Sequence, residues 1–539
     1  MTIEEKLIAL LKPERFRKSN SPKDSFEYKH PFESDYFRIV TSAPMRRLQD
    51  KTQIFPQEKS DFVRRRLTHS IEVAAIGRRL GQIVEEQMIA KGLLAKDGEY
   101  VMNFKGAIPT ILETAGLVHD IGNPPFGHFG EATIQQYFKD LEARFKVEQS
   151  LEAIQVTGAH KESKNTNEIA TAFSVTKFLL KEQREISIVA KAFAELKDKK
   201  NDFLYFDGNV QGLRILRHLG ISADDNSFNL TMPTLAAIIK YPQESLKVKP
   251  KSKIHSEQKY GYYYAEQEDY KKLCSSISLR ENHRHPLAYL LEAADDIANV
   301  TSDVEDGFKM ETISYEKIKN EVANVCDYDL KFENIESYLY AMRDGSNSNI
   351  PLEKDSNELK ELQIKEFRIR AVHKLIKEAA DLFIQEFEGL INDSYNGEPP
   401  LGGAKTSSII GQELLKDSLL RKTLSNLQSG SYEAQTVLKS EILGKNVITE
   451  LLNMFVGCMF CEEVQSQSDI TKPICLKSKS LEGKLYALIS PNYKRALGCN
   501  NKEVPRDPYH RFLLAVDHVA SMTDSYAVDL YNELTNKKR

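Results

Sequence analysis

Four residues in three separate segments of the chain could together bind one divalent metal ion. His119 and Asp120 are adjacent at the end of an apolar run. His69 opens an earlier amphipathic segment, and Asp295 lies inside a later one. Two imidazoles and two carboxylates suit Mn²⁺, Fe²⁺, Co²⁺ or Mg²⁺ better than a thiolate-rich zinc site would. A metal ion beside a phosphate or a water molecule is a main tool of hydrolases, so this set predicts hydrolytic chemistry.

The His119-Asp120 pair must lie where a helix ends. Successive residues on a helix point about 100° apart, so both side chains can reach one ion only in the last turn, where the chain departs. Asn123-Pro124-Pro125 forces that departure, because proline lacks an amide donor and restricts the residue before it. A His-Asp dipeptide alone is a weak signal, but the helix end and the other two ligands strengthen it.

His69 begins a segment with one apolar stripe. The stripe follows helical spacing through Val73, Ile76, Leu80, Ile83 and Val84, with Arg78, Arg79, Glu85 and Glu86 expected largely outside it. A histidine on such a stripe is more often a core residue that is hydrogen-bonded to a carbonyl. Its inward direction is nevertheless the one that a metal ligand needs.

Asp295 borders the apolar stripe of a third helical segment, which Pro286 opens. An acidic side chain at that edge is costly unless it is paired or bound to a metal. Asp296 should point outward and make a structural hydrogen bond. Asn299 and Asp303 follow Asp295 at intervals of four residues and therefore share its face of the helix.

His128 and Glu131 follow directly after the helix break, in the run GHFGE. A histidine with a carboxylate nearby can act as a general acid–base pair next to a metal-activated water molecule. In isolation the motif would be an ordinary loop histidine. Its position beside His119-Asp120 favours the catalytic interpretation.

Basic residues are dense in two places. Seven of them fall between Arg46 and Arg66, just before His69, and lysines alternate from Lys247 to Lys253. Charge runs are usually solvated faces. The first run nevertheless favours a pocket for an anionic ligand, and the second motivates a different class of function, nucleic-acid binding.

The composition fits a protein of two or three lobes, because 539 residues exceed what one core usually supports. Its net charge of -4 gives no general attraction to nucleic acid. Six scattered cysteines, including Cys458-x-x-Cys461, fit thiols in a reducing cytoplasm better than a zinc or redox site. No signal segment or membrane-length apolar run is present, so we expect a cytoplasmic protein without a membrane span.

Helical periodicity dominates, which predicts an all-α fold with a few short strands, for example at Tyr260 to Tyr264. A Gly/Ser/Asn-rich stretch from residue 344 to 351 separates two parts. Residues 1–343, which hold every ligand candidate, should form the chemical core. Residues 344–539 should form a helical C-terminal lobe that completes the site or builds an oligomer interface.

Long blocks of the sequence resemble the HD-domain deoxyguanosine triphosphate triphosphohydrolases. The blocks are residues 46–56 (RRLQDKTQIFP), 64–70 (RRRLTHS), 119–131 (HDIGNPPFGHFGE), 206–211 (FDGNVQ), 235–242 (LAAIIKYP), 292–298 (EAADDIA) and 522–527 (MTDSYA). They occur in order from about residue 33 to 527, although residues 305 to 500 carry little recognisable motif. The resemblance implies an HD fold that hydrolyses a dNTP, dGTP first, to a deoxynucleoside and tripolyphosphate.

The resemblance also implies roles for the metal and the reaction. His69, His119, Asp120 and Asp295 would hold a divalent ion such as Mn²⁺ or Mg²⁺. His128 and Glu131 would assist the attack at the α-phosphorus. Family members commonly form hexamers, so we expect a homo-oligomer.

The resemblance implies substrate contacts as well. Arg66 and Lys240 would hold phosphate oxygens, and Gln53 would lie against the deoxyribose. Asn299 and Asp303 are further candidates on the face of Asp295. The family often has tyrosine where this chain has Asn299, and an amide cannot stack on a sugar as a phenol does.

Two alternatives remain open at this point. One is another HD phosphohydrolase, which would act on a cyclic nucleotide, guanosine tetraphosphate or a nucleoside monophosphate. The other is a nucleic-acid-binding protein whose HD site is regulatory. Single-stranded DNA or a second nucleotide could also act as an effector of the enzyme.

Overall fold

The computed structural model describes residues 1–17, 31–53, 64–157, 180–220, 226–252, 255–325, 327–345, 353, 356–394, 414–428, 435–467 and 473–536. Helices make up nearly all of its regular structure, as the sequence predicts. The described residues hold one small antiparallel sheet, formed by β1 (Ile474–Cys475) and β2 (Glu503–Val504).

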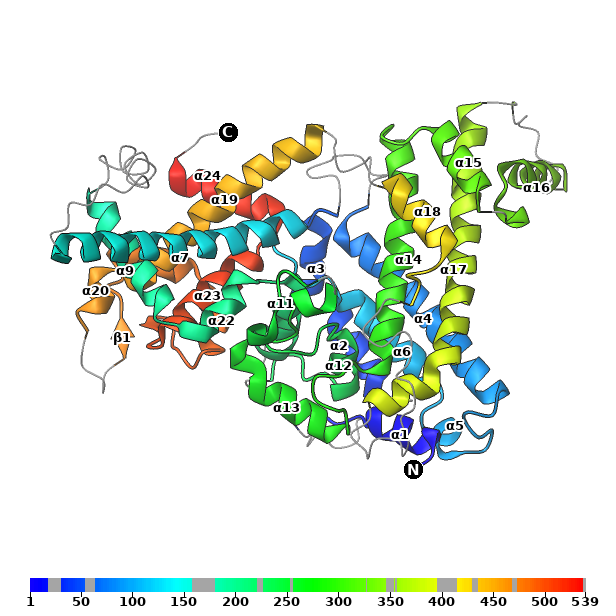
Figure 1. Cartoon of the computed structure of the whole chain (residues 1–539), viewed down its shortest axis with the longest axis horizontal. Coiled ribbons are helices and arrows are strands. Elements are labelled where there is room, and N and C mark those ends of the chain that lie inside the picture. The colour runs from blue at the N-terminus through cyan, green and yellow to red at the C-terminus, as the bar shows by residue number, and fades with distance from the viewer. Residues whose placement is uncertain are drawn as a thin grey trace.

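One group of helices surrounds the predicted ligands. Helix α4 (Arg66–Ala90) packs on α6 (Ala107–Val118), and α14 (Pro286–Lys309) and α17 (Asn357–Ser394) pack against α4 and against each other. Figure 1 shows these helices together on the right-hand side of the molecule. The smaller helices nearby are α1 (Ile3–Leu10), α2 (Pro31–Val40), α5 (Glu99–Asn103), α12 (Met232–Ile238), α13 (Gln267–Ser276), α15 (Tyr315–Ala323), α16 (Phe332–Gly345) and α18 (Leu419–Gln428).

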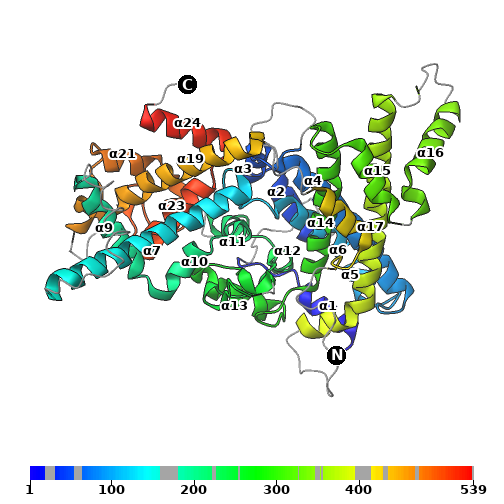
Figure 2. The same cartoon turned by 45° about the horizontal axis from the view of Figure 1, so that its top comes forward.

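A second group lies on the other side of the molecule. The long helices α7 (Gly127–Thr157) and α19 (Gln435–Phe460) pack together, and α23 (Pro508–Ala520) and α24 (Asp524–Thr535) both contact α19 (Figure 2). The remaining α-helices of the described residues are α3 (Ala43–Arg47), α9 (Leu180–Ala194), α10 (Asn201–Leu204), α11 (Gly208–Arg214), α20 (Glu462–Gln465), α21 (Leu481–Leu488) and α22 (Pro491–Arg495). C-terminal segments therefore contribute to both groups, through α17 and α18 on one side and α19 to α24 on the other.

Glycines let α4 and α6 approach closely. A Cβ atom at Gly116 would lie 2.7 Å from the Cα of Ala74, and one at Gly81 would lie 2.7 Å from the Cα of Pro109. Either contact is too short for a real side chain, so only glycine fits at these crossings. The close packing brings His69 at the start of α4 beside His119 at the end of α6.

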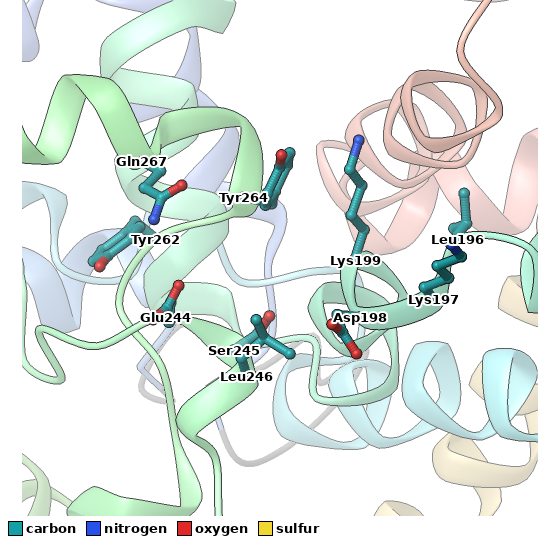
Figure 3. A pocket seen from close by; sticks show the side chains of 10 residues that line it. All are labelled: Leu196, Lys197, Asp198, Lys199, Glu244, Ser245, Leu246, Tyr262, Tyr264 and Gln267. Carbon is teal, nitrogen blue, oxygen red and sulfur yellow. The ribbon is translucent and has the colours of Figure 1, made fainter.

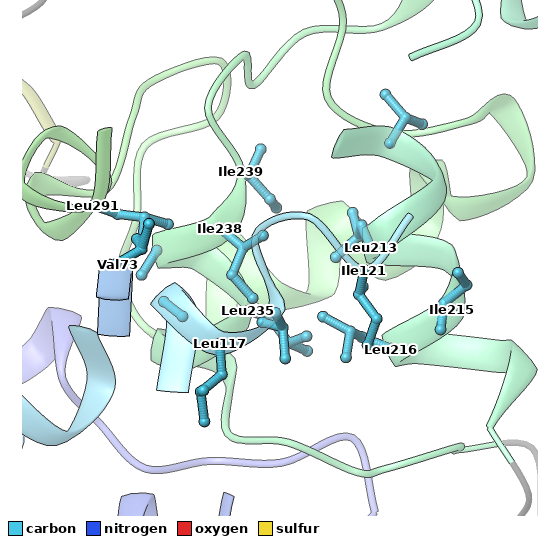
Figure 4. Packing of buried hydrophobic residues seen from close by; sticks show 14 of the residues in the cluster. Val73, Leu117, Ile121, Leu213, Ile215, Leu216, Leu235, Ile238, Ile239 and Leu291 are labelled. Atoms are coloured by element: carbon cyan, nitrogen blue, oxygen red, sulfur yellow. The ribbon is translucent and has the colours of Figure 1, made fainter. Parts of the chain in front are cut away.

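Buried aliphatic side chains around the site hold its helices in place. Val73 of α4, Leu117 of α6, Leu235 of α12 and Leu291 of α14 belong to one packed cluster (Figure 4). Ile121, directly after Asp120, is also in it. Dense packing of this kind allows little movement of the backbone that carries the ligands.

Two local predictions are wrong. Residues 260–264 do not form a strand: Tyr262 makes only an isolated bridge to Glu244. The hydroxyl groups of Tyr260 and Tyr263 instead donate to the carbonyl of Asp202 and to Gln211 Oε1, at 2.6 and 2.8 Å. These tyrosines thus anchor a buried loop rather than alternate between two faces of a sheet.

The second error concerns Glu85, which is buried on α4 rather than outside its stripe. Its carboxylate accepts hydrogen bonds from the Tyr100 hydroxyl at 2.5 Å and from the amide of Gly106 at 3.0 Å. Partners at distant sequence positions make this burial possible, and helical periodicity cannot reveal them.

Across the described ranges, we find no helix that combines the length and the apolar character needed to cross a bilayer.

Candidate metal centre

The structure brings the four predicted ligands together. One possible ligand atom from each of His69, His119 and Asp120 lies within 4.8 Å of the other two. Asp295 Oδ1 lies 3.3 Å from His69 Nε2 and 3.4 Å from His119 Nε2. The four side chains come from α4, from the turn after α6 and from the middle of α14, and helix α6 ends at Val118 so that His119 is its C-cap.

The tautomer of His119 fits a metal ligand. Its Nδ1 lies 2.7 Å from the carbonyl of Gly116, which can only accept a hydrogen bond, so Nδ1 carries the proton. The lone pair is therefore on Nε2, which is buried and has no hydrogen-bond partner among the described residues. A second group that fixes the orientation of the ring is usual for metal-binding histidines. This donor set fits a divalent ion.

Two cations balance the two carboxylates. Arg66 donates to Asp120 Oδ2 at 2.5 Å, and Lys240 donates to Asp295 Oδ2 at 2.9 Å. Burial would raise the pKa of both carboxyl groups, but the adjacent cations hold both pKa values below the ordinary range. Burial would likewise lower the pKa of His119, yet Asp120 and Asp295 together raise it. Both carboxylates are thus ionised and available as ligands at neutral pH.

Amide side chains orient the carboxylates further. Asn123 donates to Asp120 Oδ1 at 2.5 Å, and Asn299 donates to Asp295 Oδ1 at 2.8 Å. Gln53 in turn donates to Asn299 Oδ1 at 3.0 Å, while its own Oε1 is buried without a partner among the described residues. A chain of amides therefore links Gln53 to the centre. The sequence singled out Asn123 only as a helix breaker, although its spacing of three residues from Asp120 is a signal for such a contact.

His128 and Glu131 form the expected pair at the start of α7. His128 Nδ1 lies 2.9 Å from Glu131 Oε2, and Glu131 Oε1 accepts from the amide of Gly208 at 2.7 Å. The carboxylate is buried while the imidazole is 82% exposed. The hydrogen bond and negative charge of Glu131 raise the pKa of His128 above its ordinary value. A fixed carboxylate thus orients an accessible imidazole.

The other acidic residues of α14 have different surroundings. Asp296 accepts hydrogen bonds from Nε and Nη2 of Arg421 on α18, at 2.8 and 3.0 Å, which agrees with the predicted structural role. Asp303 lies two helical turns beyond Asp295, about 12 Å along the axis. Burial raises its pKa well above the ordinary value, and Asp306 raises it further. Asp303 is therefore not in contact with the four ligands.

A cavity of about 470 Å³ extends from Lys240. Its lining includes the cations Lys247 and Arg284, the rings of Tyr241 and Tyr289, and the acidic side chains Glu257 and Asp393. The volume and the aromatic side chains fit a ligand with a ring system, and the charges of the lining are mixed. A separate cavity of about 270 Å³ has Tyr262 and Tyr264 on one side and Lys197 and Lys199 on the other (Figure 3). None of the predicted site residues lines that second cavity.

The described members of the first basic run do not form one anion pocket. Arg64 pairs with Glu72, Glu305 and Asp306, and Arg47 donates to the hydroxyl of Tyr493. Arg66 is the member of the described part of the run that reaches the centre, and its Nε is buried without a partner there. Lys59 lies outside the described residues.

Acids also pair with lysines of the second basic string. Lys247 lies 3.3 Å from Glu244, and Lys249 lies 3.0 Å from Glu257. Lys253 lies outside the described residues. Such pairs reduce the charge that this string offers to a phosphate backbone.

Comparisons with known proteins agree with this geometry. A family model for the HD domain matches residues 66–200. The chain is 33% identical to a deoxyguanosinetriphosphate triphosphohydrolase-like protein of Listeria monocytogenes, over 97% of this chain and 98% of that one. It is 30% identical to a protein of the same name from Synechocystis, with the same coverage. It is 28% identical, over 96% of both chains, to a deoxyguanosinetriphosphate triphosphohydrolase of Salmonella arizonae.

Proposed function

Because the chain belongs to the HD-domain deoxyguanosinetriphosphate triphosphohydrolase family and is a phosphohydrolase, we propose that it hydrolyses deoxynucleoside triphosphates, dGTP first, to a deoxynucleoside and tripolyphosphate. One observation carries the proposal: two buried imidazoles and two ionised carboxylates from three distant segments meet within coordination reach. In this proposal His69, His119, Asp120 and Asp295 hold a divalent ion, Mn²⁺ or Mg²⁺. When bound, the ion supplies Lewis acidity toward a phosphoryl oxygen.

Arg66 and Lys240 would hold the triphosphate. Each cation already contacts a ligand carboxylate, and the Nε atom of Arg66 has hydrogen-bonding capacity left among the described residues. A triphosphate carries about four negative charges near neutral pH, so cations beside the metal ligands favour its binding. The cavity that has Lys240 in its lining would be of suitable size for the rest of the nucleotide.

His128 would move the proton in the reaction. Water oxygen forms a bond to the α-phosphorus as the bond from that phosphorus to O5′ breaks, and O5′ leaves with a proton. The exposed imidazole of His128 can transfer a proton at this centre, and Glu131 keeps its ring in one orientation. Glu131 is itself fixed by the amide of Gly208.

Gln53 would face the deoxyribose. Its unpartnered Oε1 can accept a hydrogen bond from a sugar hydroxyl, and its amide nitrogen is held by Asn299. Asn299 thus links Gln53 to Asp295 through two hydrogen bonds, whereas a stacking tyrosine at this position would make neither of these amide contacts. Asp303 stays a predicted substrate contact, although its distance from the ligands allows it to act only on a remote part of the nucleotide.

The proposal extends to assembly and place of action. We expect a homo-oligomer, by resemblance a hexamer, in the cytoplasm. Light scattering coupled to size-exclusion chromatography gives the subunit number directly. Single-stranded DNA or a second nucleotide as an effector would change the rate of hydrolysis when added to the purified enzyme.

Product analysis tests the activity. The purified protein is incubated with each dNTP and each NTP, with Mn²⁺ or with Mg²⁺, and the products are separated by ion-exchange chromatography. Release of deoxynucleoside and tripolyphosphate in equal amounts, with dGTP cleaved fastest, is the expected result. Release of pyrophosphate or of single phosphate, or cleavage only of a cyclic nucleotide, guanosine tetraphosphate or a monophosphate, would assign the chain to another class of HD phosphohydrolase.

A further inference from the structure

Three segments that are remote in sequence meet beside the candidate centre without belonging to it. They are residues 51–52, residues 123–126 and residues 520–524, and we call their meeting point the junction. The last segment overlaps the C-terminal block MTDSYA (residues 522–527), which the proposed chemistry does not use. Gln53 directly follows the first segment, and His128 follows the second after one residue, Gly127. Both are candidate active-site residues.

The carboxylate of Asp524, which is 4% exposed, joins two of these segments. Its Oδ2 accepts hydrogen bonds from the amide of Thr52 at 3.0 Å and from the hydroxyl of the same residue. Its Oδ1 accepts a hydrogen bond from the amide of Phe126 at 3.0 Å. A charged acceptor shared by three donors makes strong, directional contacts in a buried setting.

The Phe126 end of the junction is strained. Phe126 has φ of 63° and Gly127 has φ of 59°, so two successive residues adopt the left-handed conformation. For a bulky residue this conformation is unfavourable and persists only where surrounding contacts enforce it. Asp524 accepts a hydrogen bond from the amide of Phe126. The ring of Phe126 packs against Gly444, where an added Cβ atom would lie 2.8 Å from the ring. The strained turn sets the start of α7, where His128 lies.

Lys51 closes the junction from the other side. Its buried ammonium donates to the carbonyl of Asn123 and, at 3.3 Å, to that of Ala520. Burial lowers the pKa of Lys51 to about 7, and the charge of Asp524 opposes this shift. Lys51 and Asp524 thus each link the same three segments through hydrogen bonds.

We propose that Asp524 is a positioning residue, which sets the places of Gln53 and His128 relative to the metal ligands through Thr52 and Phe126. This inference rests on the proposed function, since it gives Gln53 and His128 their roles. Small displacements of reacting groups cost large factors in rate. The MTDSYA block is accordingly part of the active site's support, although it follows the last ligand by more than 200 residues.

The test compares Asp524→Asn with Ser525→Ala, a matched control. Ser525 also links α24 to the 48–53 segment, through Asp50 at 2.9 Å, but this contact is exposed and bypasses the junction. We expect Asp524→Asn to lower kcat about thirtyfold, with KM for dGTP and the Mn²⁺ affinity within about threefold of wild type. Ser525→Ala should leave all three unchanged. Thr52→Val, which removes one of the three hydrogen bonds, should lower kcat about threefold and serves if Asp524→Asn does not fold.

A double-mutant cycle separates positioning from general instability. In a His128→Ala background Asp524→Asn should cost less than about threefold, because the group that it positions is gone. The same thirtyfold loss in both backgrounds, or a loss of Mn²⁺ affinity instead of kcat, would overturn the inference.

Hydrogen exchange gives a readout that needs no activity. Asp524→Asn should speed exchange in peptides covering residues 48–53 and 124–130, and Ser525→Ala should not affect residues 124–130. Unchanged exchange in both segments of Asp524→Asn contradicts the junction. If the wild-type protein cleaves no dNTP while Asp524→Asn still speeds exchange in both segments, the proposed function is wrong, but the structural role of Asp524 at the junction is supported.

Discussion

Two buried clusters of charged side chains in this molecule differ in how their cations and carboxylates are paired. In the first, Arg214 of α11 donates to both oxygens of Asp517 on α23, at 2.7 Å from Nε and 2.7 Å from Nη2, and to Glu266 at 2.5 Å. In the second, the candidate metal centre, Arg66 and Lys240 each donate to one carboxylate oxygen, and the imidazole nitrogens of His69 and His119 lie close to Asp295.

The difference separates a structural cluster from a functional one. A bidentate guanidinium satisfies its own carboxylate and joins α11 to α23. At the metal centre the lone pair of His119 Nε2 has no donor within the described part of the chain. A buried polar atom without a partner is costly, and a metal ion bound at His119 Nε2 would remove that cost. Glu266 Oε2 of the first cluster is also buried without a partner among the described residues, so the convergence of two imidazole nitrogens on two carboxylates is what distinguishes the second cluster.

Replacing His119 should break the second cluster with the largest effect. We expect His119→Ala to lower turnover by at least about 10³-fold and to leave the purified protein without stoichiometric Mn²⁺ after dialysis, because a ligand is lost. The melting temperature should change little. Metal analysis and steady-state rates check this, with His510→Ala as a control histidine distant in sequence from the ligands. Full activity in His119→Ala would contradict the assignment.

Replacing Arg214 should break the first cluster in the opposite manner. Removing one partner of a buried ion pair leaves uncompensated charge, so Arg214→Met should reduce the free energy of unfolding by about 3–5 kcal/mol. Denaturant titration measures the loss. The exposed pair of Arg78 with Glu113 is the matched control, and Arg78→Ala should cost less than about 1 kcal/mol. At temperatures where Arg214→Met stays folded, its metal affinity should equal that of wild type.

His128 sharpens the comparison, since the charges of Arg66 and Asp120 act on its imidazole although it is not one of the proposed ligands. His128→Ala should lower turnover by about 10²-fold while Mn²⁺ stays bound, because proton transfer is lost and the ligands are intact. Turnover and bound metal are measured on the same preparation. Near-normal turnover would refute the role of His128.

A smaller effect is expected from replacing Glu131, because this replacement should change the pKa of His128 rather than remove the imidazole. The hydrogen bond and negative charge of the carboxylate stabilise the protonated imidazole, so Glu131→Gln should lower the pKa of His128 toward that of a free histidine. The stability that this pair contributes is complete below the pKa of a free histidine and is lost as the pH rises through the higher folded value. Histidine NMR of the metal-free protein, with His128→Ala to assign the signal, measures the shift. An unchanged or higher pKa in Glu131→Gln would disprove the coupling.

The sequence predicted those features that depend on local pattern. The stripe of α4 placed His69 inward, the proline pair ended α6 beside His119, and the edge of the stripe on α14 distinguished Asp295 from Asp296. All three follow from helical periodicity or from proline chemistry, and the fold class follows from the same signals.

Features that depend on remote partners were not predictable in this way. Arg64 belongs to the same basic run as Arg66, but acids on α4 and α14 neutralise it. Glu85 is buried because Tyr100 and Gly106 satisfy it. The contact of Asp524 with Thr52 spans 472 residues, and no local pattern reveals a pairing of that kind.

Anomalous diffraction from crystals grown with Mn²⁺ tests the central claim most directly. The account predicts one strong peak about 2 Å from His69 Nε2, His119 Nε2 and an oxygen of each of Asp120 and Asp295. Absence of a peak there at saturating Mn²⁺, or a peak bound only by other residues, would contradict the claim that these four side chains form the hydrolytic centre.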